Sequence, residues 1–244
     1  MATRGPRRPP APHAEGGPRR PPLSRSLVLD AALRLVDSEG LDALTMRRVG
    51  RELGRDPMAL YRYADNRDDL LDGVAELVLA QLDIPSDSQD WATQLRTTAH
   101  EFRQLALEHP HVVPLLVTRP LRTPLGLRPL GILRPLEQII TLLTGAGFTP
   151  QQALRAYRAY FGFLYGHILI ELQEVVADPE ESDDLLRLGL HRLPLREFPH
   201  VRALATDLAY YDGLAELDHG LDVLLTGLGQ PVRQTTPPSR EALP

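Results

Sequence analysis

Two short amphipathic segments meet at a tight turn in residues 44–63, and this pairing constrains the fold more than any other feature. The first segment begins after Thr45, whose hydroxyl suits the capping position of a helix, and it ends at Gly54 after barely two turns. The second begins near Pro57, where proline suits the first turn of a helix, and runs to about Tyr63. Two short helices joined by a glycine turn predict a helix-turn-helix.

The rest of the chain also has the pattern of helices. Residues 24–40 carry apolar side chains at helical spacing, between a serine cap at Ser24 or Ser26 and a stop at Gly40. Asn66 is placed to cap a fourth helix. Alternating runs of Val, Ile and Thr and the Asn-Gly hairpin signal do not occur in the sequence. We therefore predict an all-α fold.

Composition divides the chain into four parts. Residues 1–23 are rich in Pro, Gly and Arg, with five arginines against one glutamate, and are predicted to be a disordered basic arm. This arm is either a solvated tail or a source of further DNA contacts. The helix-turn-helix domain is predicted at 24–72 and a disordered tail at 231–244. The larger helical domain between them, 73–230, exceeds what a DNA clamp alone needs.

The stretch "LTMRRVGRELGRDPMALYRYADNRDDLLDGV" resembles the DNA-binding domain of the TetR family of bacterial transcription regulators. The Leu-Thr opening, the Leu-Gly turn, the Leu-Tyr pair and the basic residue before Leu-Leu carry the resemblance. Two positions depart from the family pattern. Gly50 stands where alanine is usual, which is expected to loosen the second helix slightly. Asp56 stands where a small hydroxyl residue commonly caps the third helix, and its negative charge is expected to narrow operator choice.

The resemblance and the chemistry of the side chains together predict a DNA interface. Small or apolar residues let a helix enter the major groove deeply, and an arginine can bond guanine with two hydrogen bonds. We expect sequence to be read by Arg47, Met58, Ala59 and Arg62. We expect phosphates to be held by Thr45, Tyr61, Tyr63 and Arg67, with Pro57 beside them. A purely packing role for Tyr61 is the alternative.

The larger domain has two helices that suggest a homodimer. Thr149 and Gln152 form a capping-box pattern at the start of a long helix that is apolar on nearly all sides. Leucines spaced by three and four follow in the last helix. As in TetR-like proteins, a four-helix bundle between two subunits is expected, although one seam within a single chain is the alternative. The predicted interface residues are Tyr160, Phe163, His167, Leu217, Leu221 and Leu224.

A weaker resemblance, in "WATQLRTTAHEF" and "VTRP", is to the tetracycline repressor branch of the family. Carried over by position, it implies that Thr98, Phe102, Leu115 and Arg119 face an effector pocket. Thr98 stands where the tetracycline binders use an amide, and Leu115 where they use a metal-binding histidine. Because leucine cannot ligate Mg²⁺, the expected effector is largely apolar and is not Mg-tetracycline. Arg119 would meet an anion or carbonyl of the effector, or a loop carbonyl.

The remaining motifs argue against other classes of protein. No HExxH, G-x-S-x-G or phosphate-loop motif and no cysteine occurs, so neither an enzyme nor a cofactor is expected. His109 and His111 lack a nearby third ligand, so no metal site is expected. No apolar run is long enough for a bilayer, and a cytoplasmic location is expected. Much of the net charge of −5 comes from an acidic loop at 178–187.

The prediction is therefore a ligand-responsive transcription regulator. We expect a repressor that binds a near-palindromic operator in double-stranded DNA as a homodimer and is released by a small molecule. A transcription activator of the same fold stays open as an alternative. An all-α interaction module without DNA binding is the other alternative.

Overall fold

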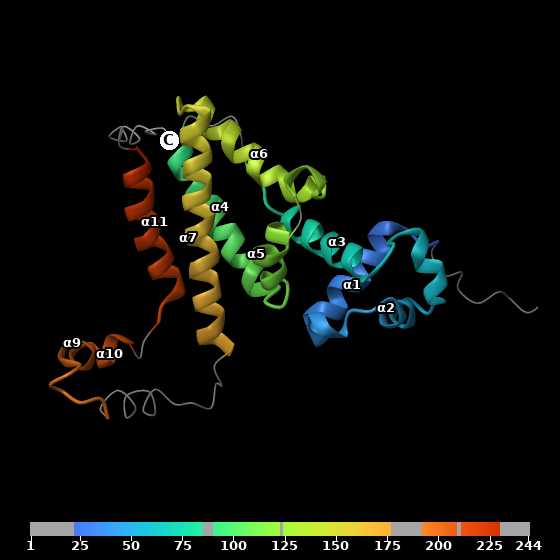
Figure 1. The fold of residues 1–244 in the computed structure, drawn as a ribbon, viewed down its shortest axis with the longest axis horizontal. Helices are drawn as coiled ribbons and strands as arrows, with labels where there is room; N and C mark the ends of the chain where they lie inside the picture. Colours follow the sequence, from blue (N-terminus) through green and yellow to red (C-terminus); the bar gives the residue numbers. More distant parts are fainter. Residues whose placement is uncertain (1–21, 85–89, 123, 177–191, 209–210, 230–244) are drawn as a thin grey trace, which may run out of the picture.

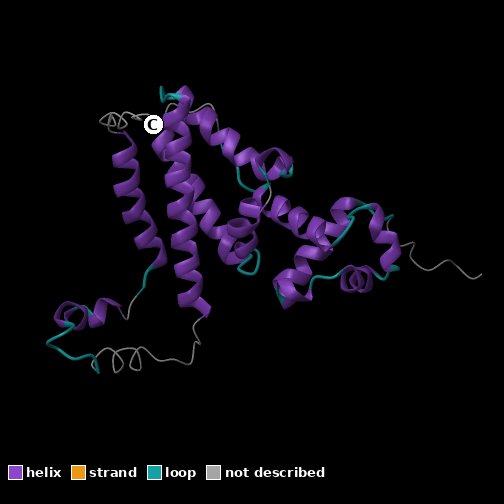
Figure 2. Cartoon of the chain, in the orientation of Figure 1, coloured by secondary structure: helices purple, strands orange, loops and turns teal. Residues whose placement is uncertain are grey.

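The computed structural model describes most of the chain between the two terminal segments. The described residues are 22–84, 90–122, 124–176, 192–208 and 211–229. Within these ranges every regular element is helical and no strand occurs (Figure 2), which confirms the predicted fold class. The predicted tail, the acidic loop and nearly all of the predicted arm lie outside the described residues.

The N-terminal head has the predicted helices. It consists of α1 (Arg25–Glu39), a short turn η1 (Leu41–Ala43), α2 (Met46–Leu53) and η2 (Pro57–Arg62). Ser24 and Thr45 cap α1 and α2, since their side chains accept hydrogen bonds from the backbone N–H groups three residues ahead. Gly54 ends α2 in a left-handed conformation, with φ of 60°, which glycine adopts without strain.

The third predicted helix is a 3-10 helix. In η2 the N–H of Ala59 donates to the carbonyl of Asp56, and that of Tyr63 to Leu60, so the bonds span three residues rather than four. Asp56 caps the element as predicted, with its carboxylate 2.8 Å from the N–H of Met58. Leu60 is the one buried residue of η2, and such short pieces commonly take 3-10 geometry.

A single helix, α3 (Arg67–Leu79), joins the head to the body (Figure 1). Asn66 caps it as predicted. Its first half packs on α1, and its second half reaches α5 and α6 of the body. Leu70, Val74 and Val78 are buried along its length. Movement in the body therefore reaches the head through this helix.

The body is a bundle of longer helices. These are α4 (Trp91–Glu108), α5 (Val113–Arg122), α6 (Leu130–Gly145), α7 (Pro150–Val176) and α11 (Gly213–Gly229), with a short η3 (Leu125–Leu127) and two short helices, α9 (Pro199–Ala203) and α10 (Ala205–Leu208). α7 and α11 stand side by side at the end farthest from the head (Figure 1). The predicted capping box is confirmed: the N–H of Thr149 donates to Gln152 Oε1 at 2.8 Å, and the N–H of Gln152 donates to Thr149 Oγ1 at 3.3 Å. None of the described helices is long and apolar enough to cross a bilayer.

Candidate DNA interface and effector cavity

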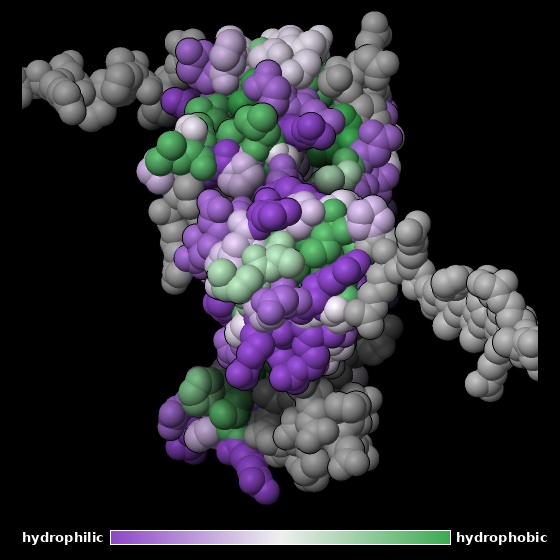
Figure 3. Space-filling view, turned by 90° about the vertical axis from the view of Figure 1, so that its right-hand side faces the viewer, coloured by the Kyte–Doolittle hydropathy of each residue, from purple (hydrophilic) through white to green (hydrophobic). Residues whose placement is uncertain are grey.

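The predicted base-reading residues lie on the exposed surface of α2 and η2. Met58 is 73% exposed, and Arg47 and Arg62 are also exposed. Neither guanidinium has a hydrogen-bond or ion-pair partner among the described residues, so both keep all their donors for a ligand. Ala59 is half-buried beside them. Figure 3 faces this end of the molecule, where polar side chains prevail at mid-height and smaller apolar patches interrupt them.

Two of the predicted phosphate donors are free to act. Thr45 Oγ1 accepts the N–H of Arg48 at 3.2 Å, which leaves the hydroxyl proton of Thr45 available. Tyr61 is 46% exposed, so its ring is not fully occupied by packing. Pro57 begins η2 and fixes the direction in which Met58 and Tyr61 leave the turn.

Tyr63 and Arg67 already make bonds within the chain. The hydroxyl of Tyr63 donates to the carbonyl of Leu23 at 2.8 Å, and a phenol has only one proton to donate, so the expected donation to phosphate is corrected. Arg67 donates from Nε and Nη2 to the carbonyls of Leu44 and Leu41, both at 2.8 Å. A guanidinium has five N–H groups, so a phosphate contact by Arg67 stays a prediction.

Gly50 has a role that its low helix propensity conceals. The N–H of Arg55 donates to the carbonyl of Gly50 at 2.8 Å, which closes the turn onto α2. A Cβ atom at Gly50 would lie 3.0 Å from the carbonyl oxygen of Arg55 and 3.3 Å from the nitrogen of Pro57. Glycine therefore lets the turn lie close against α2, which offsets the expected loosening of that helix.

A cavity of about 510 Å³ lies between α5, α6 and α7, next to the end of α3. Tyr157, Phe161 and Tyr165 of α7 form an aromatic wall, with the rings of Tyr157 and Phe161 4.8 Å apart. Leucine, isoleucine, valine and proline form most of the remaining surface. The volume and the apolar lining suit a small organic molecule.

The two tyrosines are neutral hydrogen-bonding groups of the cavity. Burial raises the pKa of Tyr165 and of Tyr157, and the positive charge of Arg128 partly opposes the rise at Tyr157. Neither hydroxyl has a hydrogen-bond partner within the described ranges. Both phenols can therefore donate to a bound molecule at neutral pH.

The residues that were expected to line the pocket lie one layer behind it. Thr98, Phe102 and Leu115 are at most 5% exposed, and none of them lines the cavity. Phe102 packs edge-on against Phe161 and Tyr165, with ring centroids 6.3 and 5.6 Å away. Arg119 belongs to α5, but its side chain lies outside the described part of the structure. The cavity wall was missed because residues of α7 at helical spacing have the pattern of ordinary core.

The cavity touches the connecting helix at two points. Leu79, the last residue of α3, is part of its lining. The N–H of Gly131, which precedes the lining residue Ile132 in α6, donates to Oε1 of Glu76 in α3 at 2.9 Å. A molecule in the cavity would therefore press on residues directly joined to the helix that carries the head.

A second junction between head and body uses the paired histidines. His109 Nδ1 lies 3.0 Å from a carboxylate oxygen of Asp37, and His111 Nδ1 lies 3.0 Å from the carbonyl oxygen of Val36. Both contacts hold the last turn of α1. No group of three metal-ligating side chains occurs in the described residues.

Four of the predicted dimer residues are buried within one chain. Tyr160, Leu217 and Leu221 are fully buried, and His167 is 8% exposed between α7 and α11. The hydroxyl of Tyr160 donates to the carbonyl of Leu95 at 2.7 Å. Buried side chains of this kind cannot contact a second subunit, so the prediction was wrong for these four, and for them the single-chain seam holds. Phe163 and Leu224 are half-buried, and their contact with a partner stays a prediction.

A helix-turn-helix head joined by one helix to a body with an apolar cavity defines a DNA-binding regulator controlled by a small molecule. The family model of TetR bacterial regulatory proteins matches residues 28–74, and that of the tetracyclin repressor-like C-terminal domain matches residues 84–232. The chain therefore belongs to the TetR family of transcription regulators, as the sequence predicted.

Several relatives are similar over most of their length. The tetracycline repressor protein class C of Escherichia coli is 30% identical over 82% of this chain and 91% of its own. The HTH-type transcriptional repressor DrrR1 of Streptomyces coeruleorubidus is 28% identical over 83% of this chain and 78% of its own. The crystal structure of the TetR family protein ActR of Streptomyces coelicolor with actinorhodin has a TM-score of 0.72 and 28% identity, and it covers 85% of this chain and 97% of that one.

Proposed function

We propose that the chain is a homodimeric repressor that releases its operator when a small, largely apolar molecule enters the cavity between α5, α6 and α7. The observation that carries this proposal is the contact between the cavity and α3, through Leu79 and the Gly131–Glu76 hydrogen bond. The relatives named as repressors, and the ActR structure with actinorhodin, support the same combination of DNA release and a small-molecule effector.

The proposed dimer face lies on the outer side of α7 and α11. Ala159, Gly166 and Ile170 of α7 are exposed, and Ile170 is 53% exposed. Val223 of α11 is 65% exposed. Phe163 joins the two helices, because its ring fills the position where a Cβ atom of Gly220 would lie. Apolar and small side chains on two adjacent helices suit a four-helix bundle with the same helices of a partner.

In this dimer each head would place η2 in the major groove of one half-site. Arg62, Arg47 and Met58 would read base edges, and Thr45 and Tyr61 would hold phosphates. The distance between the heads must match the helical repeat of DNA. A small tilt of α3 in each subunit therefore costs contacts at both half-sites.

Occupancy of the cavity would weaken DNA binding by linkage. An effector that binds the DNA-free geometry better by some factor must weaken DNA binding by the same factor. Couplings of about 1–3 kcal/mol are usual for such systems. Because the chromosome lies in the bacterial cytoplasm, we place the protein there and give it no catalytic role.

The direct test is DNA binding, measured by fluorescence anisotropy with DNA that flanks the protein's own gene. We expect log affinity to fall linearly and steeply with log salt concentration, because released counterions drive the binding. Tyr61→Ala and Arg62→Ala should weaken binding, whereas Arg155→Ala, on the exposed surface of α7, should not. Binding that is absent or indifferent to salt would defeat the proposal.

A further inference from the structure

The cavity is apolar but carries an unbalanced positive charge. Arg128 and Arg158 belong to its lining, and no aspartate or glutamate does among the described residues. The two arginines come from different elements, since Arg128 precedes α6 and Arg158 lies on the second turn of α7. A purely apolar effector would use neither of them.

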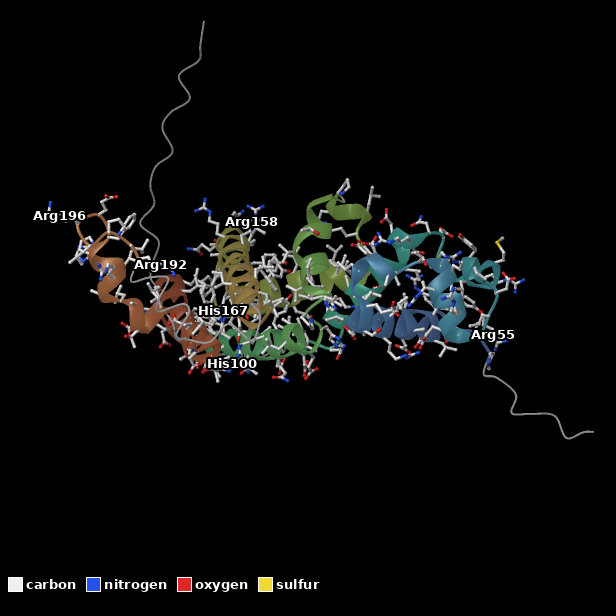
Figure 4. The ribbon with its side chains drawn as sticks, turned by 90° about the horizontal axis from the view of Figure 1, so that it is seen from below. Arg55, His100, Arg158, His167, Arg192 and Arg196 are labelled. Carbon is white, nitrogen blue, oxygen red and sulfur yellow. The ribbon has the colours of Figure 1, made fainter. Side chains whose placement is uncertain are left out.

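Arg158 stands at the rim of the cavity. Its side chain is exposed and projects from the side of α7 (Figure 4), and it has no hydrogen bond or ion pair within the described ranges. Arg128 is half-buried and lies close enough to Tyr157 for its charge to lower the pKa of that phenol. The cation at position 128 therefore faces the aromatic wall, and the one at 158 faces its opening.

This arrangement selects the charge of a ligand. Apolar walls exclude water, so a charge inside them interacts more strongly with a nearby guanidinium than it would in bulk solvent. An anion beside Arg128 also meets the free hydroxyls of Tyr157 and Tyr165, which can donate hydrogen bonds to it. A cationic ligand would lose its hydration and gain only repulsion.

We infer that the effector is an organic anion with an apolar, aromatic body, whose acidic group is held by Arg128 and Arg158. The aromatic body packs against Tyr157, Phe161 and Tyr165. This inference rests on the proposed function, because it names the chemical class that the proposed effector cavity takes.

The test compares two probes that share an apolar skeleton and differ by one acidic group: 8-anilinonaphthalene-1-sulfonate and the neutral N-phenyl-1-naphthylamine. Binding is titrated by probe fluorescence with the full chain. We expect the sulfonate to bind about tenfold more tightly, the ratio that corresponds to about 1.4 kcal/mol. Arg128→Gln and Arg158→Gln should each remove most of that preference and leave the neutral probe unchanged.

Two controls fix the place of binding. Arg155→Gln removes an exposed charge that lies one turn earlier on α7, outside the cavity lining, and should change neither dissociation constant. Gly162 lines the cavity, and a Cβ atom there meets nothing within 4 Å, so Gly162→Trp can fill the cavity without a backbone clash and should abolish binding of both probes. Unfolding temperatures check that each variant is folded.

The outcomes separate the two proposals. Equal affinity for both probes, or a sulfonate preference that survives both glutamine variants, overturns the anion inference and leaves the cavity as an apolar site. Binding that persists in Gly162→Trp places the probes elsewhere and also overturns the inference. Failure of both probes to bind the unaltered chain contradicts the effector cavity itself.

Discussion

Arginine is the chain's only basic residue type, with 27 copies and no lysine, yet its copies have different roles. Arg62 and Arg47 extend into solvent from the head without a partner among the described residues. Arg67 holds two carbonyls of the loop before α2, and Arg103 holds the buried Glu171 with Nε 3.0 Å from Oε2. The charge is the same in each, and the surroundings decide whether it recognises a ligand or stabilises the fold.

This difference predicts opposite behaviour for two arginines of the head. Arg67→Gln should lower the free energy of unfolding by about 1–2 kcal/mol, because two loop carbonyls lose their donors. Arg62→Gln should leave stability unchanged and weaken operator binding by about 1–3 kcal/mol if it contacts a base. Urea unfolding and fluorescence anisotropy measure the two effects. Equal stability of both variants would contradict the bracing role of Arg67.

His167 predicts a dependence of stability on pH. Burial lowers the pKa of His167, although the nearby Glu171 opposes this shift, and Arg103 and Glu216 also act on the ring. With a folded pKa below the ordinary 6.5, the unfolded chain binds more protons in this window. The contribution of His167 is therefore complete above about pH 6.5 and is lost as the pH falls below it.

Urea unfolding at pH 7.5 and at pH 5.5 checks this behaviour. His167→Gln should lose less stability between the two pH values than the unaltered chain does. His100→Gln is the matched control, since His100 is partly exposed and lies 2.7 Å from Asp218 on the bundle surface. An unchanged pH slope in His167→Gln would show that other groups set it.

Residue identity alone predicted exposure in the head but not the partners. Met58 and Arg62 are exposed as their recognition role requires. The hydrogen bonds of Tyr63 and Arg67 go to backbone carbonyls at Leu23, Leu41 and Leu44, and every residue has such a carbonyl. No sequence pattern distinguishes the carbonyls that accept, so these bonds emerge only from the fold.

At the scale of elements, η2 combines recognition with a charged cap. Asp56 accepts the N–H of Met58, and its side chain is exposed beside the residues that would meet phosphates. Serine would keep the hydrogen bond to the backbone and remove the charge. The cap and the repulsion can thus be separated experimentally.

Asp56→Ser should bind operator DNA more tightly, by roughly twofold to threefold, as expected for one exposed charge. Stability should change little, because serine and aspartate cap helices comparably. Asp56→Ala also removes the charge but should cost about 1 kcal/mol of stability through loss of the cap. Anisotropy titrations and urea unfolding give the two quantities, and weaker binding by Asp56→Ser would assign the carboxylate a favourable role at the DNA.

The ends of elements were more predictable than their packing. Caps at Ser24, Thr45, Asn66 and Thr149 were predicted and confirmed, because capping is a local property of a few adjacent residues. α7 is apolar on nearly all sides, and its pattern does not distinguish the core, a cavity wall and a subunit interface. The residues of α7 therefore needed the structure for their assignment.

At the scale of the whole molecule, the proposed dimer depends on the face formed by α7 and α11. Ile170→Glu together with Val223→Glu places carboxylates on an exposed apolar face, and in a dimer these would be buried without partners. We expect a monomer by light scattering and weaker operator binding, because each head then binds alone. Leu127→Glu in η3, 75% exposed in the unaltered chain, should remain dimeric. A dimer that survives the double change would place the interface elsewhere.

The contact between Gly131 and Glu76 has a consequence for how such a regulator diversifies. A Cβ atom at position 131 would lie 2.3–2.8 Å from the carboxyl end of Glu76, so a larger residue there must displace the side chain that accepts the Gly131 N–H. Glu76 itself is not part of the cavity lining. Residues that recognise the effector can therefore change over generations while the linkage to the head is inherited intact, and we expect substitutions at 76 and 131 to arise together.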